Sequence, residues 1–500
     1  MKNLLIASAA VCVASASFAA VKPASVFNHN MVLQREKPVP VWGVADPGEK
    51  ITVSFGETTR TCVAAADGTW RVDLAPMPAC ETPRDLRIGS VAFTNVVVGE
   101  VWLCSGQSNM TLKLWREPGI SKHSGRETDG YYDSILVDDT GIRAASVKQV
   151  WSIEEQAFLK EERLDWTMFT SGSQRALSAI AFNYAVTLRN ALKIPIGVVV
   201  SAWGGAAIEP FISPDGFRSV KGLEHFADKK LVNSFDGKIL TDEEDAKNPS
   251  AAGKKPTKKR GGAPKQCRII WNSMIRPLVP MAIRGAIWYQ GETNRSQELL
   301  YADYLEALWN SWSKAFENPE LSFYLVQLAP YRYGNKPSEY CGIWTAQENF
   351  ARRHPHAGMV ASIDCGELDN IHPCRKRTVS MRLAAMALNR DYGRKDIPCD
   401  GPALVSATAK DGAVTLKFDH VKCWCRCGDP RPDEFEVAGE DGVFKPATPK
   451  FGPGKIIVSS AEVVAPKAVR YLWSWLAFGA IKSEVGLPLT PFNVPVETAR

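Results

Sequence analysis

Near-continuous apolar runs of strand length alternate with helical stretches between about residues 99 and 395. A strand that is apolar on both faces has to be covered on both, and alternation with helices is typical of a parallel sheet between two helix layers. We therefore predict a three-layer α/β fold, in which functional residues gather at the carboxyl ends of the strands. The apolar runs are Val96–Leu103, Ile196–Val200, Ala282–Tyr289, Leu321–Leu328 and Met359–Ile363, and the helical stretches are Leu177–Leu192, Tyr301–Phe316 and Val379–Tyr392.

The segments on either side of this region have a different pattern. Apolar and polar residues alternate in Ile51–Phe55, Trp70–Leu74, Val414–Phe418 and Lys455–Ser459. This alternation indicates strands with one buried face. A chain of 500 residues also exceeds what one hydrophobic core usually organises. We predict a β-sandwich-like domain at 20–98, the α/β domain at 99–395 and a second β-sandwich-like domain at 396–500.

The first residues have the pattern of a signal peptide. Lys2 precedes the apolar stretch Leu4–Val13 and the small-residue stretch Ala14–Ala20. The apolar stretch is shorter than the roughly 20 residues that span a bilayer, and this arrangement is typical of a cleavable export signal. We expect cleavage after Ala19, which makes residues 1–19 a signal peptide. The protein is then expected to be exported, periplasmic or extracellular, with no membrane insertion after cleavage.

Export permits disulfides, and the cysteine count bears on them. Removal of Cys12 with the signal peptide leaves eleven of the twelve cysteines, so at least one has no partner within the chain. Two pairings stay open, Cys62 with Cys80 and Cys365 with Cys374. The cysteines that alternate without the C-x-x-C spacing of zinc sites are Cys423, Cys425 and Cys427.

A basic segment contributes much of the formal net charge of +6. Lys254–Arg260 lies among Gly, Ala and Pro, within an insertion at about 245–266. A nucleic-acid patch is one interpretation. The segment contains no aromatic residue, and like charges in a Pro/Gly-rich context stay solvated. We therefore predict a surface insertion and no nucleic-acid partner, and the sequence indicates no oligomeric state.

The first strand end that carries chemistry is Val98–Met110, a strand followed by a turn of small residues with Ser105 and Ser108. A serine at such a turn exposes its hydroxyl at the sheet edge, where an adjacent base makes it a nucleophile. The alternative is that both serines cap a helix. This segment alone does not decide between the two.

Two further strand ends offer hydrogen-bond donors. Gly204 and Gly205 follow one strand, and paired glycines leave backbone N–H groups unobstructed, as an oxyanion hole requires. Gln290 follows the next, where its amide could donate to developing negative charge. Glu292 is either a second acid/base group or a structural anchor of its loop.

The fourth strand end supplies the base. Of the seven histidines, His372 alone has an acidic residue, Asp369, three positions earlier. On a short turn this spacing lets the carboxylate reach the imidazole Nδ1–H and direct Nε2 toward a serine. A surface loop explains His354 and His356 better than a metal site does. The order serine, Gly-Gly, Gln and Asp-x-x-His favours a nucleophilic hydrolase.

This order resembles the SGNH (GDSL-type) hydrolases, specifically the sialate O-acetylesterase family. The resemblance runs from about residue 21 to the end, and two positions depart from it. Ala206 stands where the family commonly has Thr, and the basic insertion is extra. The matching segments are Gly99–Met110, Ser201–Gly205, Trp288–Asn294, Asp369–Pro373, Val469–Trp473 and Gly486–Phe492.

The resemblance implies a role for each matching residue. Ser108 rather than Ser105 is the nucleophile, with Asp369 and His372 completing the triad. The implied oxyanion hole consists of Gly204, Gly205 and Gln290, and the implied substrate-binding residues are Asn109, Glu292 and Asn294.

The resulting hypothesis is an exported serine esterase that removes O-acetyl groups from an acetylated glycan, with no metal and no organic cofactor. Sialate is the substrate that the resemblance implies, and acetylated xylan or pectin is the alternative. A non-catalytic glycan-binding protein would lack a triad member, and none is missing. A lipase or thioesterase would need an apolar acyl groove, whereas fifteen Trp suit sugar stacking at least as well.

Overall fold

The computed structural model describes most of the chain. The described ranges are 21–114, 137–161, 163–170, 173–231, 265–333, 336–426, 434–479 and 481–498, with the backbone of the short strands β12 (Ser234–Phe235) and β13 (Lys238–Ile239). The predicted signal peptide, most of the 245–266 insertion and Cys427 lie outside these residues.

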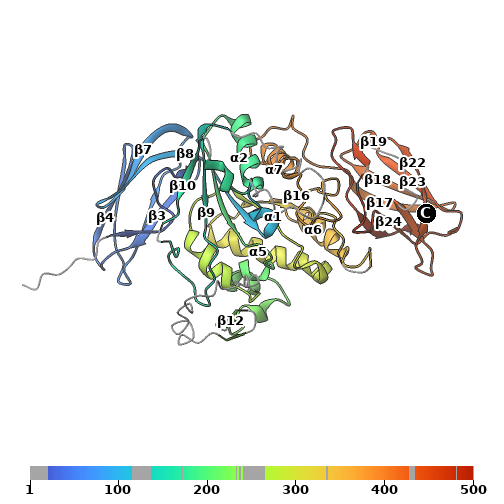
Figure 1. Ribbon diagram of the computed structural model, residues 1–500, viewed down its shortest axis with the longest axis horizontal. Helices are drawn as coiled ribbons and strands as arrows, with labels where there is room; N and C mark the ends of the chain where they lie inside the picture. Colours follow the sequence, from blue (N-terminus) through green and yellow to red (C-terminus); the bar gives the residue numbers. More distant parts are fainter. Residues whose placement is uncertain are drawn as a thin grey trace, which may run out of the picture.

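A largely parallel sheet forms the centre of the molecule (Figure 1). Its strand order is β10-β9-β11-β8-β14-β15-β16, with parallel pairing from β9 to β16 and β10 antiparallel at the edge. Of these seven strands β8 comes first in the chain, and it lies between β11 and β14, where successive connections leave in opposite directions. Ligands bind at such a point, beyond the carboxyl ends of the strands. The bounds are β8 Val91–Gly106, β9 Asp139–Ser146, β10 Trp166–Phe169, β11 Ile196–Ala202, β14 Gly285–Tyr289, β15 Ser322–Val326 and β16 Ala357–Val360.

Helices cover both faces of this sheet, as the apolar strands require. Trp102 and Cys104 of β8 pack in one core with residues of α2 and α7, whereas Val101 and Leu103 belong to the core that contains α5 and α6. The predicted α/β class is confirmed. The helices are α1 Ser108–Thr111, α2 Ala179–Leu192, α3 Pro214–Arg218, α5 Tyr301–Ala315, α6 Gly342–Arg353 and α7 Lys376–Arg390.

The amino-terminal β region is continuous with the central sheet through β8. Early residues of β8 pair with β7 and β2, and the segment from Glu100 to Gly106 pairs with β11 and β14. The boundary predicted at residue 98 therefore falls inside a strand. The strands of this amino-terminal region besides β8 are β1 Lys22–Pro23, β2 Val32–Gln34, β3 Val39–Val44, β4 Lys50–Phe55, β5 Thr58–Val63, β6 Thr69–Leu74 and β7 Cys80–Ile88.

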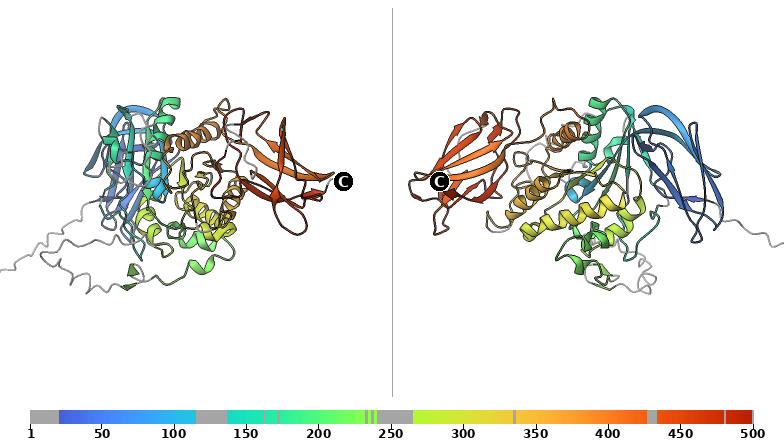
Figure 2. Two further views of the ribbon diagram at one scale, coloured as in Figure 1. Left: turned by 45° about the vertical axis from the view of Figure 1, so that its right-hand side comes forward. Right: turned by 180° about the vertical axis from the view of Figure 1, so that it is seen from behind.

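The carboxyl-terminal β region lies on the opposite side of the central sheet (Figures 1 and 2). One of its sheets has the order β22-β23-β18-β17-β27, a second β21-β20-β24-β26, and β19 pairs with β25. The strands are β17 Ala403–Lys410, β18 Ala413–Asp419, β19 Trp424–Arg426, β20 Phe435–Ala438, β21 Lys445–Pro446, β22 Thr448–Gly452, β23 Lys455–Ser459, β24 Ala468–Tyr471, β25 Ile481–Ser483, β26 Phe492–Pro495 and β27 Glu497–Thr498.

None of the helices in the described ranges combines the length and the apolar character needed to span a bilayer.

Candidate active site

The turn after β8 presents Ser108 and buries Ser105. Gly106 has a φ of 135°, and a Cβ built on it would lie 2.2 Å from the carbonyl oxygen of Tyr289, so this turn requires glycine. Gln107 N–H donates to the same carbonyl at 3.0 Å, and α1 then begins at the partly exposed Ser108. The Ser105 hydroxyl donates to the Ser201 carbonyl inside the sheet. Of the two serines, only Ser108 is placed to meet a substrate.

The loop after β11 brings Gly204 beside the serine. A Cβ built on Gly204 would lie 3.7 Å from Ser108 Cβ, and Trp203 N–H donates to the Gly106 carbonyl at 3.0 Å. Within the part of the chain that the structure describes, the N–H groups of Gly204 and Gly205 have no hydrogen-bond acceptor. These amides are therefore not engaged by the described part of the protein, and their role as oxyanion donors stays a prediction.

Gln290, after β14, is completely buried and hydrogen-bonded within the protein. Its Nε2 donates to Gln107 Oε1 at 3.1 Å, Ala206 O at 3.2 Å and Asn294 Oδ1 at 2.6 Å. Its Oε1 accepts a hydrogen bond from the Tyr301 hydroxyl at 2.6 Å. The side chain thus joins the loops after β8, β11 and β14. Donation from Gln290 to a substrate oxygen stays a prediction.

Asn109, Glu292 and Asn294 are also internal, with exposed fractions of 1%, 3% and 2%. Asn109 Nδ2 donates to Glu292 Oε1 and to the Ile371 carbonyl, the latter at 3.1 Å. Asn294 Nδ2 donates to Glu209 Oε2 at 2.9 Å. These contacts match the structural-anchor interpretation of Glu292. The expected substrate contacts of the three residues stay predictions.

The Asp369 carboxylate has an ion-pair partner that the sequence does not indicate, and its contact with His372 stays a prediction. Asp369 lies on an exposed turn, and among the described residues the recorded partner of its carboxylate is Arg332, at 3.4 Å. The turn is closed by Asn370, whose N–H donates to the Glu367 carbonyl and whose Oδ1 accepts from His372 N–H at 3.0 Å. The backbone turn thus holds Asp369 outward. An exposed ion pair of this kind contributes about 0–1 kcal/mol, so reorienting the carboxylate costs little.

Lys376, at the start of α7, is a site residue that the sequence did not indicate. Its exposed fraction is 1%, its Nζ donates to Asn109 Oδ1, and the ammonium lies 5.1 Å from the centre of the Tyr289 ring. Burial lowers the pKa of Lys376 to about 8, against the raising effect of the Glu292 charge. Burial raises the pKa of Glu292, against the hydrogen bond from Asn109 and the charge of Lys376. The Arg375-Lys-Arg377 run resembles an exposed basic segment, so no sequence pattern pointed to this residue.

Neither cysteine pairing left open by the sequence is formed. Cys62, Cys80 and Cys365 carry free thiols, which also excludes a bridge between Cys365 and Cys374. The described residues contain no group of three or more His, Cys, Asp or Glu side chains suited to a metal ion. His354 packs against Trp309 with ring centres 3.9 Å apart, and burial lowers the pKa of His354 to about 4.

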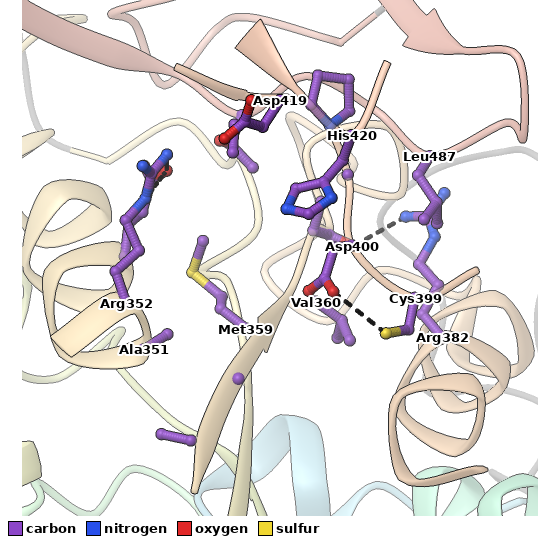
Figure 3. A pocket seen from close by; sticks show the side chains of 18 of the residues that line it. Ala351, Arg352, Met359, Val360, Arg382, Cys399, Asp400, Asp419, His420 and Leu487 are labelled. Atoms are coloured by element: carbon purple, nitrogen blue, oxygen red, sulfur yellow. Dashed lines mark hydrogen bonds and ion pairs between the residues drawn. The ribbon is translucent and has the colours of Figure 1, made fainter. Parts of the chain in front are cut away.

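A groove of about 460 Å³ separates β16 from the carboxyl-terminal β region (Figure 3). Met359 and Val360 lie on one side and Asp419 and His420 on the other. None of the predicted site residues lines it. Asp400 in this groove pairs with Arg390 at 2.6 Å and accepts a hydrogen bond from the Cys399 thiol at 3.4 Å.

Comparison with known proteins supports the hydrolase interpretation. A family model described as carbohydrate esterase, sialic acid-specific acetylesterase, matches residues 267–389. The sialate O-acetylesterase of Mus musculus is 30% identical over 437 residues, which cover 79% of this chain and 78% of the mouse protein. The chain belongs to the sialate O-acetylesterase family.

The protein is accordingly an O-acetyl ester hydrolase. The sialate O-acetylesterase of Homo sapiens is 29% identical over 436 residues, covering 79% of this chain and 76% of the human protein. The crystal structure of a carbohydrate acetylesterase from Xanthomonas citri superposes with a TM-score of 0.78 at 30% identity, covering 95% of this chain and 99% of that one. The match therefore extends through both flanking β regions.

Proposed function

We propose that this protein is an exported serine esterase that removes O-acetyl groups from sialate or a related acetylated carbohydrate, with Ser108 as nucleophile. One observation carries the serine mechanism: Ser108 begins α1 at the end of β8, and Gly204 lies against it with an unengaged amide. Within SGNH-type chemistry these are the positions of nucleophile and oxyanion donor. The central sheet with its two helix layers is then the SGNH domain, and the two β regions are sandwich-like.

The reaction proceeds by two acyl transfers. Ser108 Oγ attacks the ester carbonyl while His372 accepts its proton, and the Ser108 and Gly204 N–H groups hold the oxyanion. The carbonyl re-forms, the sugar oxygen departs with the proton from His372, and an acetyl-serine remains. Water then attacks the acetyl group with His372 as base, which releases acetate and restores Ser108.

Asp369 supports His372 after turning away from Arg332. The exposed Arg332 pair is weak, whereas a carboxylate at the imidazolium stabilises charge that develops during each acyl transfer. Gln290 acts either by lending one of its amide hydrogens to the oxyanion or by holding the three loops in register. Asn109, Glu292 and Asn294 are buried, so their predicted role in substrate binding requires that a sugar group enters the site far enough to contact them.

The names of the relatives support two substrate classes. The mammalian relatives are named sialate O-acetylesterases, and the relative from Xanthomonas citri is named a carbohydrate acetylesterase. We place sialate first because the curated relatives share it. Acetylated xylan and pectin are the alternatives. The export signal at residues 1–19 would bring the enzyme to glycans outside the cytoplasm.

Acetate release from O-acetylated sialosides, acetylated xylan and acetylated pectin tests this proposal. Ser108→Ala should reduce turnover by about 10⁴-fold or more. Ser105→Ala is the matched control: among the described residues its buried hydroxyl bonds to the Ser201 carbonyl inside the sheet, so turnover should stay near wild type. Full activity of Ser108→Ala would refute the mechanism. Binding of these glycans without acetate release from any would favour the non-catalytic alternative.

A further inference from the structure

Three loops of the candidate active site meet at one buried side chain. Asn109 follows Ser108 in the turn after β8, and its Nδ2 donates to Glu292 Oε1 in the loop after β14. The same nitrogen donates to the carbonyl of Ile371, the residue before His372, at 3.1 Å. On its other side, Asn109 Oδ1 accepts a hydrogen bond from Lys376 Nζ. Every hydrogen-bonding atom of this amide is therefore engaged.

The two charged partners are removed from water. The exposed fractions of Lys376 and Glu292 are 1% and 3%, and the Lys376 ammonium also lies over the Tyr289 ring. Glu292 Oε2 has no hydrogen-bond partner among the described residues, although it is buried. Burial of two charged groups is unfavourable unless each offsets the other and hydrogen bonds satisfy them. A merely structural contact could be made by apolar residues at lower cost, so retention of the two charges points to a positioning role.

The direction of the hydrogen bonds follows from the charges. An ammonium only donates, so Lys376 requires the oxygen of the Asn109 amide, and the nitrogen must then face Glu292 and Ile371. A carboxylate only accepts, so Glu292 imposes the same orientation from the other side. If the Asn109 amide flipped, its NH₂ group would face the Lys376 ammonium and its oxygen would face the Glu292 carboxylate. Asn109 therefore holds the Ser108 turn at one fixed distance from the His372 segment.

We propose that Lys376, Asn109 and Glu292 form a buried clamp that positions the serine turn against the histidine loop, with all three acting as positioning residues. This inference rests on the proposed serine mechanism. The clamp contacts no reacting atom. It sets the geometry in which the Ser108 hydroxyl and the His372 imidazole meet, and a misplacement of about 1 Å in such a pair lowers turnover by up to about 10²-fold.

Steady-state kinetics on 4-nitrophenyl acetate and the rate of Ser108 labelling by a fluorophosphonate test the clamp. Asn109→Leu, Lys376→Met and Glu292→Gln should each lower kcat and the labelling rate by about 10- to 10²-fold, while KM changes by less than about 3-fold. Ser380→Ala is the control. Its buried hydroxyl bonds to the Lys376 carbonyl on the same helix, α7, and to the Ile180 carbonyl on α2, and its loss should lower Tm without lowering kcat.

A double variant addresses loss of stability. Lys376→Met leaves Glu292 uncompensated, and adding Glu292→Gln removes that charge, so the double variant should have a higher Tm than Lys376→Met alone while kcat stays low. Recovery of kcat together with Tm would show a merely structural role and overturn the clamp. The clamp alone would also be refuted if all clamp variants kept the wild-type kcat while Ser108→Ala was inactive. Full activity of Ser108→Ala would refute the serine mechanism first.

Discussion

The side-chain amide of Asn109 donates a hydrogen bond to the backbone carbonyl of Ile371 at 3.1 Å. Asn109 directly follows Ser108, and Ile371 directly precedes His372. The proposed nucleophile and base lie 264 positions apart in the numbering of the chain, from 108 to 372, yet their neighbours are in direct contact. This contact ties the loop that carries the proposed nucleophile to the loop that carries the proposed base.

Arg332→Gln should raise activity modestly. The substitution releases Asp369 from a pair whose side chains are 63% and 74% exposed, and an exposed pair is worth about 0–1 kcal/mol. The expected gain in kcat/KM on an acetyl ester is therefore at most about 5-fold. The control is Arg352→Gln, which breaks an exposed pair with Glu348 on α6. A fall in activity confined to Arg332→Gln would instead make Arg332 part of the substrate site.

The two glycines near Ser108 should respond differently to alanine. At Gly106 the new Cβ would lie 2.2 Å from a backbone oxygen, at a φ of 135°, so we expect a loss of about 2–5 kcal/mol in the free energy of unfolding. At Gly204 the nearest atom to a new Cβ is 3.7 Å away, so stability should stay near wild type. Urea denaturation measures both. Equal destabilisation by the two substitutions would contradict the described turn.

Gln290→Ala distinguishes the two roles of this residue. If Gln290 mainly joins the loops, the buried partners left unsatisfied should lower stability by about 1–3 kcal/mol. An oxyanion donor would instead show a loss of about 10²–10³ in kcat with little loss of stability. We expect the stability loss to be present. Gln347→Ala is the matched control, because Gln347 is equally buried and bonds to Leu328 N–H and the Val326 carbonyl away from Ser108.

Asp364→Asn should destabilise the protein in a pH-dependent way. Burial raises the pKa of Asp364, but hydrogen bonds and charges of Arg382 and Lys482 outweigh it and hold the pKa well below its usual value. A carboxylate with a lowered folded-state pKa adds stability above its unfolded pKa near 4, and loses it as the pH falls further. Removing the charge should cost about 3–5 kcal/mol at pH 7.

Denaturation curves from pH 7 to pH 2 measure this difference. The gap between wild type and Asp364→Asn should be constant above about pH 5 and shrink below pH 4. Because Lys482 lies on β25 and pairs with Asp364 at 2.8 Å, the change should also loosen the carboxyl-terminal β region, which limited proteolysis would detect. Asp396→Asn, at an exposed pair with Arg394, serves as the control and should show neither effect. A gap that widens toward low pH would contradict the assigned pKa direction.

Much of the central fold follows from hydrophobic pattern. The predicted runs at Ile196–Val200 and Ala282–Tyr289 contain most of β11 and β14, and the stretch Tyr301–Phe316 contains α5. β11 and β14 are buried on both faces, which leaves a continuous apolar run in the sequence. α5 is buried along one stripe, which leaves a helical period. β9, Asp139–Ser146, was not predicted because its polar residues interrupt any apolar run, and its place in the sheet comes from pairing with β11 and β10.

The site was predictable where backbone geometry constrains the residue type. Gly106 and Gly205 have positive φ angles that favour glycine, and the sequence therefore marks these two turns. Lys376 was not predictable, because whether a lysine is buried depends on packing against Asn109 and Tyr289 from distant parts of the chain. The orientation of Asp369 likewise depends on the Asn370 turn rather than on the Asp-x-x-His spacing.

β8 has a consequence for how this protein can be taken apart. One uninterrupted strand, Val91–Gly106, pairs with amino-terminal strands at its beginning and ends next to Ser108. A cut between the two regions would leave half a strand on each fragment and an unpaired edge in both sheets. The amino-terminal strands are therefore expected to unfold together with the central sheet, as one cooperative unit. For engineering, this junction therefore offers no site at which the amino-terminal region could be exchanged as a separate module.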